Sequence, residues 1–179
     1  MVGFIHTYDN LLDVAACAHL IGILDAGPIT FVRSPGRQCA ALVLDPWPPA
    51  VRSAVQSGFT RYMDGVGNVA GCVLRAARWI ERPKLVRYVP GDDFKEHPDR
   101  GDEISSSRAV SIVIYLNDVK GGELVFPRQA VTVQPARGRA VYFPSDFTHT
   151  HEARTPVDGR KDVLTTWMRF APNDYTQPI

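Results

Sequence analysis

The chain has 179 residues, 45% hydrophobic and 22% charged, which suits one globular domain with its own core. A formal net charge of +1 gives no electrostatic footprint for nucleic acid or a membrane surface, and no apolar run reaches the roughly 20 residues that span a bilayer. Cys17, Cys39 and Cys72 fit neither a disulfide framework nor a paired metal motif, and the N-terminus lacks a secretory pattern. We therefore expect a soluble, cytoplasmic protein without nucleic-acid or membrane partners.

The first 83 residues have mainly helical patterns. Apolar residues recur at helical spacing over 9–25, and a second helix is predicted from 48 to about 65, with prolines in its first turn. Between them, two β-like runs around a turn predict a hairpin over 29–44. A third helix is predicted over 68–81, with a strand near Trp79 as the alternative.

From residue 84 the pattern changes to short strands separated by turn residues. The eight predicted strands are 84–89, 94–99, 109–116, 123–126, 130–134, 140–143, 148–151 and 163–170. Many short strands with tight connections are typical of a two-sheet jelly roll. We expect one α+β domain over 1–179, in which residues 1–83 support a jelly-roll core over 84–171.

The stretch from Arg87 to Asp99 ends in half of a metal site. His97 and Asp99 are two residues apart, so on an extended strand both side chains leave the same face. The later histidines, His149 and His151, are the candidates for a third ligand. Two imidazoles and one carboxylate hold Fe(II) with open positions, although a lone His-x-Asp is weak evidence.

A basic residue that follows His149 and His151 strengthens this interpretation. Lys161 follows His151 by ten residues, and on the predicted strand it shares one face with Thr165 and Trp167. A buried cation near a metal would bind a dicarboxylate tail, and the phenol of Tyr88 could add a hydrogen bond to the same ligand.

Several short motifs follow one another in a characteristic order between residues 87 and 170. They are Arg87-Tyr88-x-x-Gly91-x-x-Phe94-x-x-His97-x-Asp99, Tyr115-Leu116-Asn117-Asp118, Gly121-Gly122-Glu123-Leu124-x-Phe126-Pro127, Pro135-x-x-Gly138-x-Ala140-x-x-Phe143, His151-Glu152, and Pro156-Val157 with Gly159 and Lys161. This order resembles the prolyl 4-hydroxylase branch of the Fe(II)- and 2-oxoglutarate-dependent dioxygenases.

The resemblance implies a double-stranded β-helix core, which agrees with the jelly roll. It implies iron ligands at His97, Asp99 and His151, and it places the distal carboxylate of 2-oxoglutarate at Lys161 and Tyr88. The implied cofactors are Fe(II), 2-oxoglutarate and O2, with ascorbate as a candidate reductant. The carboxylate ligand argues against halogenase chemistry, because halogenating relatives lack it to leave room for halide.

Some positions depart from the family pattern. Leu124 stands where the family often has threonine, so Thr165 or Ser111 is the candidate for that polar contact with 2-oxoglutarate. Compared with the family pattern, the chain has one residue more between His151 and Pro156 and one fewer between Pro156 and Lys161. The interval from the histidine to the lysine is therefore unchanged, which favours Lys161 over Arg160.

His149 remains the rival of His151. The two are two residues apart, so strand parity does not separate them, and the interval to Lys161 favours His151. His149, Trp167 and Arg160 are then candidate neighbours of the metal ligands.

The resemblance implies an enzyme that hydroxylates an unactivated C–H bond and releases succinate and CO2. Its substrate would be prolyl, amino-acid-like or another small metabolite, either free or within a peptide. We expect specificity to reside in the N-terminal third and the 102–108 loop. A cupin-like enzyme with non-oxidative chemistry and a catalytically silent binding module are the alternatives.

Overall fold

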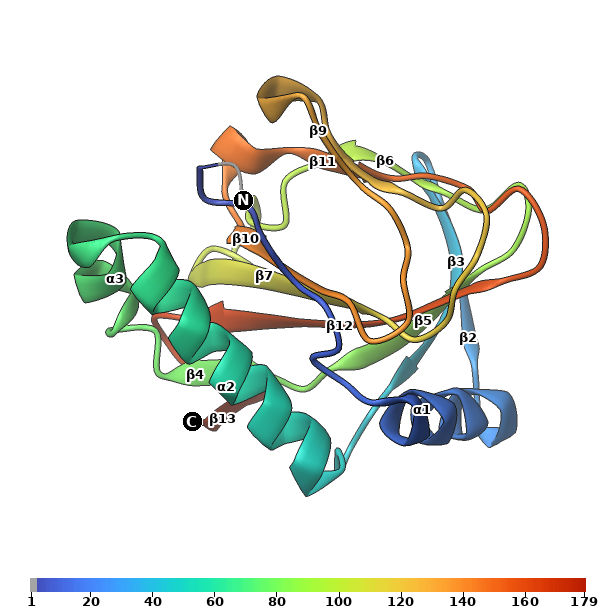
Figure 1. Ribbon diagram of the computed structural model, residues 1–179, viewed down its shortest axis with the longest axis horizontal. Helices are drawn as coiled ribbons and strands as arrows, with labels where there is room; N and C mark the ends of the chain where they lie inside the picture. The colour runs from blue at the N-terminus through green and yellow to red at the C-terminus, as the bar shows by residue number, and fades with distance from the viewer. Residues whose placement is uncertain (1–2) are drawn as a thin grey trace.

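The computed structural model describes residues 3–179 as helices packed against a curved, antiparallel β-structure (Figure 1). The helices are α1 (Val14–Ala26), α2 (Pro49–Gly65) and α3 (Asn68–Leu74), with short 3-10 turns η1 (Pro127–Gln129) and η2 (Phe147–His149). The strands are β1 (His6–Tyr8), β2 (Thr30–Ser34), β3 (Arg37–Val43), β4 (Trp79–Glu81), β5 (Lys84–Tyr88), β6 (Phe94–His97), β7 (Arg108–Tyr115), β8 (Leu124–Phe126), β9 (Val131–Val133), β10 (Ala140–Pro144), β11 (His151–Ala153), β12 (Lys161–Arg169) and β13 (Thr176–Pro178).

The first two helices form close to their predicted ranges, although α1 begins at Val14 and not at residue 9. The side chain of Asp13 accepts a hydrogen bond from the Ala16 backbone N–H at 2.7 Å and so caps the start of α1. Proline occupies the first turn of α2, where its missing N–H costs no helical hydrogen bond. In the described part of the chain, no helix is long and apolar enough to cross a membrane.

The strands form one continuous hydrogen-bonded sheet that folds at one corner into two parts, called here the larger and the smaller sheet. The larger has the order β1-β10-β7-β12-β5-β3, and the smaller has the order β6-β11-β8-β9. They connect where Arg37 of β3 pairs with Phe94 of β6. Figure 1 shows α1 and α2 on one side of the larger sheet and β6, β9 and β11 on the other. The predicted α+β jelly roll is confirmed.

Strand alternation divides the apolar residues between two cores. On β12, Leu164 packs in the cluster that contains the helices, whereas its neighbour Val163 packs in the cluster between the sheets. Leu85 and Val86 divide in the same way on β5. Successive strand residues point to opposite faces, so the larger sheet buries both of its faces.

The predicted helix over 68–81 is wrong beyond Leu74. Helix α3 ends there, and Trp79–Glu81 forms β4, which agrees with the alternative of a strand near Trp79. Ile80 is fully buried and pairs with Met168 of β12. Pairing and burial against a neighbouring strand outweigh the helical periodicity of a short segment.

The predicted strand over 148–151 is also partly wrong. Asp146 caps the 3-10 turn η2, accepting a hydrogen bond from the Thr148 backbone N–H, and β11 begins only at His151. The parity argument that placed His149 and His151 on one face therefore does not apply. The short strands β1 and β13 were not predicted, because three-residue segments carry too little alternation to recognise.

Helix α2 packs closely against Tyr142 of the larger sheet at Gly58. A Cβ atom there would overlap the Tyr142 hydroxyl, which donates a hydrogen bond to the Val55 carbonyl at 2.9 Å. We expect Gly58→Ala to lower the free energy of unfolding by about 1–3 kcal/mol through overpacking. Gly22→Ala, whose Cβ meets nothing within 4 Å, should instead raise it by about 0.5–1 kcal/mol. Urea denaturation measures both, and equal effects at the two positions would contradict this packing.

Candidate metal centre and its cavity

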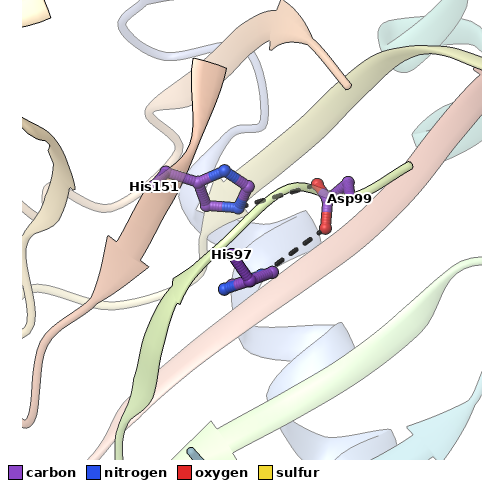
Figure 2. A group of neighbouring side chains, drawn as sticks. All are labelled: His97, Asp99 and His151. Carbon is purple, nitrogen blue, oxygen red and sulfur yellow. Dashed lines mark ion pairs between the residues drawn. The ribbon is translucent and has the colours of Figure 1, made fainter. Parts of the chain in front are cut away.

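Three predicted ligands meet at the end of β6 and the start of β11. The donor atoms of His97, Asp99 and His151 all lie within 4.8 Å of one another. The two Asp99 carboxylate oxygens lie 3.6 Å from His97 Nε2 and 3.7 Å from His151 Nε2. Figure 2 shows both rings and the carboxylate turned toward a common point. These separations exceed hydrogen-bond length, so the three groups surround a space.

Backbone carbonyls fix the orientation of both imidazole rings. His97 Nδ1 lies 2.6 Å from the Lys95 carbonyl oxygen, and His151 Nδ1 lies 3.2 Å from that of His149. A carbonyl only accepts, so each Nδ1 carries a proton, and in a neutral ring the lone pair of Nε2 then points toward Asp99. Two imidazole nitrogens and a carboxylate that converge in this way suit a positive charge among them, either a proton on a ring or a metal ion. The residues therefore fit a bound divalent metal.

Burial and charge tune the three side chains. Burial opposes ionisation of Asp99, but the imidazoles of His151 and His97 outweigh it and hold the pKa of this carboxyl well below its usual range. Burial lowers the pKa of His151, which favours the neutral, ligating form. The side chains of His151 and Asp99 are only 5% and 10% exposed, so solvent has little access to the centre.

The centre opens into a cavity of about 390 Å³ between the two sheets. Its lining includes the inward-facing residues of two paired strands, namely Lys84, Val86 and Tyr88 of β5 and Lys161, Val163, Thr165 and Trp167 of β12. The face predicted for Lys161, Thr165 and Trp167 is the face that lines the cavity. Such a volume falls within the range of about 300–1,000 Å³ that small-molecule sites occupy.

Lys161 occupies one end of this cavity. Its ammonium group donates hydrogen bonds to the Gly122 carbonyl at 3.2 Å and the Arg154 carbonyl at 2.6 Å, and it lies 4.3 Å from the ring centroid of Tyr88. Burial lowers the pKa of Lys161 to about 8. A Cβ atom on Gly122 would press against the lysine stem, at 2.9 Å from Cδ. The Gly-Gly turn therefore also accommodates Lys161.

The other candidate neighbours occupy different environments. Thr165 and Trp167 line the cavity at its opposite end, where Thr165 pairs with Lys84. Arg160 lies outside the cavity lining and forms an ion pair with Asp25 at 3.0 Å.

His149 and Ser111 lie beside the centre without joining the cluster of three donors. The His149 ring makes an edge contact with Phe4, and its Nδ1 lies 2.8 Å from the Thr148 hydroxyl. Only its backbone carbonyl reaches the centre, through His151. Ser111 lies on β7, and its hydroxyl is 2.9 Å from that of Ser145.

A cationic group at the open end of the cavity was not predicted. Arg108 makes two hydrogen bonds to Glu81, at 2.7 and 2.8 Å, and lies 3.8 Å from the Trp167 ring centroid. Arg37 stacks over Phe94 at 4.6 Å, and Phe94 in turn stacks on His97. These residues come from separate strands without a common motif. Arg108 shares strand parity with Val110, Ile112 and Ile114, which pack on the helix side, and a register shift separates it from them, so parity gave no signal for it.

Residues 83–169 match the family model of the 2OG-Fe(II) oxygenase superfamily. The similarity to this superfamily covers just under half of the chain. This family implies Fe(II), 2-oxoglutarate and O2. Over 103 residues the chain is 32% identical to prolyl 4-hydroxylase subunit alpha-1 of Gallus gallus and 29% identical to that of Homo sapiens. Each match covers 51% of this chain, and the chain spans about a fifth of these relatives, at 20% and 19%.

Solved structures of this family have the same fold. The viral collagen prolyl hydroxylase of Paramecium bursaria Chlorella virus-1 superposes with a TM-score of 0.73 at 19% identity, covering 94% of this chain and 97% of that one. A prolyl-4-hydroxylase of Pseudomonas putida gives 0.72 at 22% identity, covering 96% and 95%. At these identities the likeness establishes the fold alone.

The two neighbouring histidines offer a direct test of the ligand set. We expect His151→Ala to weaken Mn(II) binding by more than about 100-fold, since loss of a ligand should exceed the 10–100-fold cost of losing a supporting contact. His149→Ala should bind Mn(II) like the wild type, because its ring faces Phe4 and its backbone carbonyl remains. Electron paramagnetic resonance of free Mn(II) measures both affinities. The reverse order would make His149 the ligand.

Proposed function

We propose that this chain is an Fe(II)- and 2-oxoglutarate-dependent dioxygenase that hydroxylates an unactivated C–H bond. The observation that carries the proposal is the convergence of two Nε2 lone pairs on the Asp99 carboxylate at the wall of a cavity. The buried cation of Lys161 lines the same cavity. Metal ligands and a carboxylate-binding cation together suit a chelating dicarboxylate.

In this proposal His97, Asp99 and His151 hold Fe(II), and Lys161 and Tyr88 bind the distal carboxylate of 2-oxoglutarate. The bound iron supplies dioxygen activation, which is coupled to oxidative decarboxylation of 2-oxoglutarate to succinate and CO2. Ascorbate is a candidate reductant for iron that becomes oxidised.

The protein side chains position these groups and exclude water. Burial raises the pKa of Tyr88, so its phenol stays protonated and can donate a hydrogen bond. Val86 and Val163 form apolar walls beside Lys161, which strengthens a charge-assisted contact there. Phe94 stacks on the His97 ring and holds it in place.

The proposed substrate is an amino-acid-type or small-metabolite group, either free or in a peptide. Relatives of known sequence are named prolyl 4-hydroxylases, which supports a prolyl-like group. Gly101, Asp102, Ile104 and Ser105 line the open side of the cavity, so the loop before β7 is a candidate for selecting it. A non-oxidative metal enzyme or a silent module has no need of the buried lysine, and neither is favoured.

A cytoplasmic location is part of the same proposal. Within residues 3–179 the three cysteines are free thiols, with Cys17 and Cys39 buried and Cys72 exposed. Unpaired thiols suit a reducing compartment.

Anaerobic addition of Fe(II) and 2-oxoglutarate tests the activity class. Chelation of iron by the keto acid should produce a visible charge-transfer band in the wild type. In Lys161→Ala, the 2-oxoglutarate concentration that gives half of the maximal band should rise more than about tenfold, which corresponds to the loss of one charge-assisted hydrogen bond. Lys120→Ala, an exposed lysine outside the cavity lining, is the matched control and should behave like the wild type. Absence of the band in the wild type would contradict the proposal.

The pKa of Lys161 makes the affinity for 2-oxoglutarate depend on pH. A pKa lowered to about 8 means that the binding cation is fully present well below pH 8 and is lost as the pH rises through it. We expect the dissociation constant to be constant below this range and to rise by up to about tenfold per pH unit above it.

Lys161→Arg provides the control, because a guanidinium stays charged throughout. Its dissociation constant, read from the same charge-transfer band, should change little across pH 8. An equal slope in the wild type and the Lys161→Arg variant would show that another group causes the pH dependence.

A further inference from the structure

Lys84 lies at the end of the cavity opposite Lys161. It is four residues before Tyr88 on β5, so both side chains face inward, and it pairs across the sheet with Thr165. Its ammonium group is 5.7 Å from the ring centroid of Trp167. Lys84 therefore faces the part of the cavity that 2-oxoglutarate, held at Lys161, would leave free.

Lys84 has no anionic partner among residues 3–179. The nearby acids are already engaged, because Glu81 binds both Arg108 and Arg169 and Asp99 faces the two histidines. Asp102, at the mouth of the cavity, hydrogen-bonds Ser105. A half-buried ammonium group without a counter-charge has lost hydration and gained no ion pair in return.

A second uncompensated cation lines the same cavity. Arg37 stacks on Phe94, makes no ion pair in the described part of the chain, and has a buried Nε without a hydrogen-bond partner. Burial, followed by the charges of Arg108 and Arg37, lowers the pKa of Lys84. Both guanidinium groups are thus close enough to repel the ammonium group of Lys84, and an anion beside it would relieve this repulsion.

The charges of the cofactors do not provide that anion. A divalent metal with Asp99, and the 2-oxoglutarate dianion with Lys161, balance one another. Glu81 offsets Arg108 only in part, since it also binds Arg169. Lys84 and Arg37 remain positive in the loaded site, and the remaining ligand is the substrate.

We propose that Lys84, assisted by Arg37, binds a carboxylate group of the substrate. The substrate is then an amino-acid-sized carboxylic acid, either free or as the C-terminal residue of a short peptide. This inference rests on the proposed dioxygenase function. Apolar side chains line the cavity near Lys84, with Trp167 5.7 Å from its ammonium group and Val113 on the far side of Thr165, so they suit an aliphatic body next to the carboxylate. A cavity of about 390 Å³ that also holds 2-oxoglutarate leaves space for a small group.

The test compares L-amino acids and dipeptides with their C-terminal amides, including L-proline and L-prolinamide. Binding to the full chain loaded anaerobically with Fe(II) and 2-oxoglutarate is followed by the change in the charge-transfer band, and binding to the metal-free chain by calorimetry. The acid of the best-binding pair should bind at least about tenfold more tightly than its amide, as expected for one charge-assisted hydrogen bond. Free acids and dipeptides distinguish the two forms of substrate.

Two variants assign the preference to Lys84. Lys84→Met, of similar length and without charge, should remove the preference for the acid, and Lys84→Arg should retain it. Lys120→Met is the control and should match the wild type. An equal affinity for acids and amides, no binding of either, or a preference that survives in Lys84→Met would overturn the proposal.

The charge-transfer band and the preference for acids together distinguish a failure of the Lys84 proposal from a failure of the dioxygenase proposal. A wild-type charge-transfer band without preference for acids overturns only the role of Lys84. A missing band contradicts the dioxygenase function, while a Lys84-dependent preference for acids in the metal-free chain would still support the carboxylate site.

Discussion

The site depends on where two imidazole protons lie. The carbonyls of Lys95 and His149 accept hydrogen bonds from Nδ1 of His97 and His151. The Nε2 atom of each ring is thereby turned toward the Asp99 carboxylate. This arrangement suits a cation shared by the three side chains. It also explains why a 3-10 turn precedes β11, because that turn presents the His149 carbonyl to the ligand ring. The backbone thereby sets the tautomer and the orientation of the two proposed ligand rings.

The pairing of β5 with β12 extends this centre into a directional cavity. Their inward residues place Lys161 beside Tyr88 at one end and Thr165 beside Lys84 at the other. On the opposite face, Arg87 makes two hydrogen bonds to the fully buried Asp162, at 2.6 and 2.9 Å, which holds the two strands together. One strand pair thus separates the proposed co-substrate end from the proposed substrate end.

The sequence predicts what depends on local periodicity and fails where tertiary contacts decide. Strand parity correctly predicts the cavity face of β12, because its residues keep a period of two from Lys161 to Trp167. The same parity misjudges His149, since the Asp146 cap turns the chain out of the strand. The helix predicted beyond Leu74 fails because β12 captures Ile80. Arg37 and Lys84 belong to strands that meet only after folding, so no sequence spacing links them.

The central claim is that His97, Asp99 and His151 surround one divalent cation. Anomalous diffraction from crystals soaked in Mn(II) tests it most directly. The account predicts a single strong peak within bonding distance of Nε2 of His97, Nε2 of His151 and one carboxylate oxygen of Asp99, with 2-oxoglutarate, when added, extending from it toward Lys161. A peak at His149, or no peak between the two rings, would contradict it.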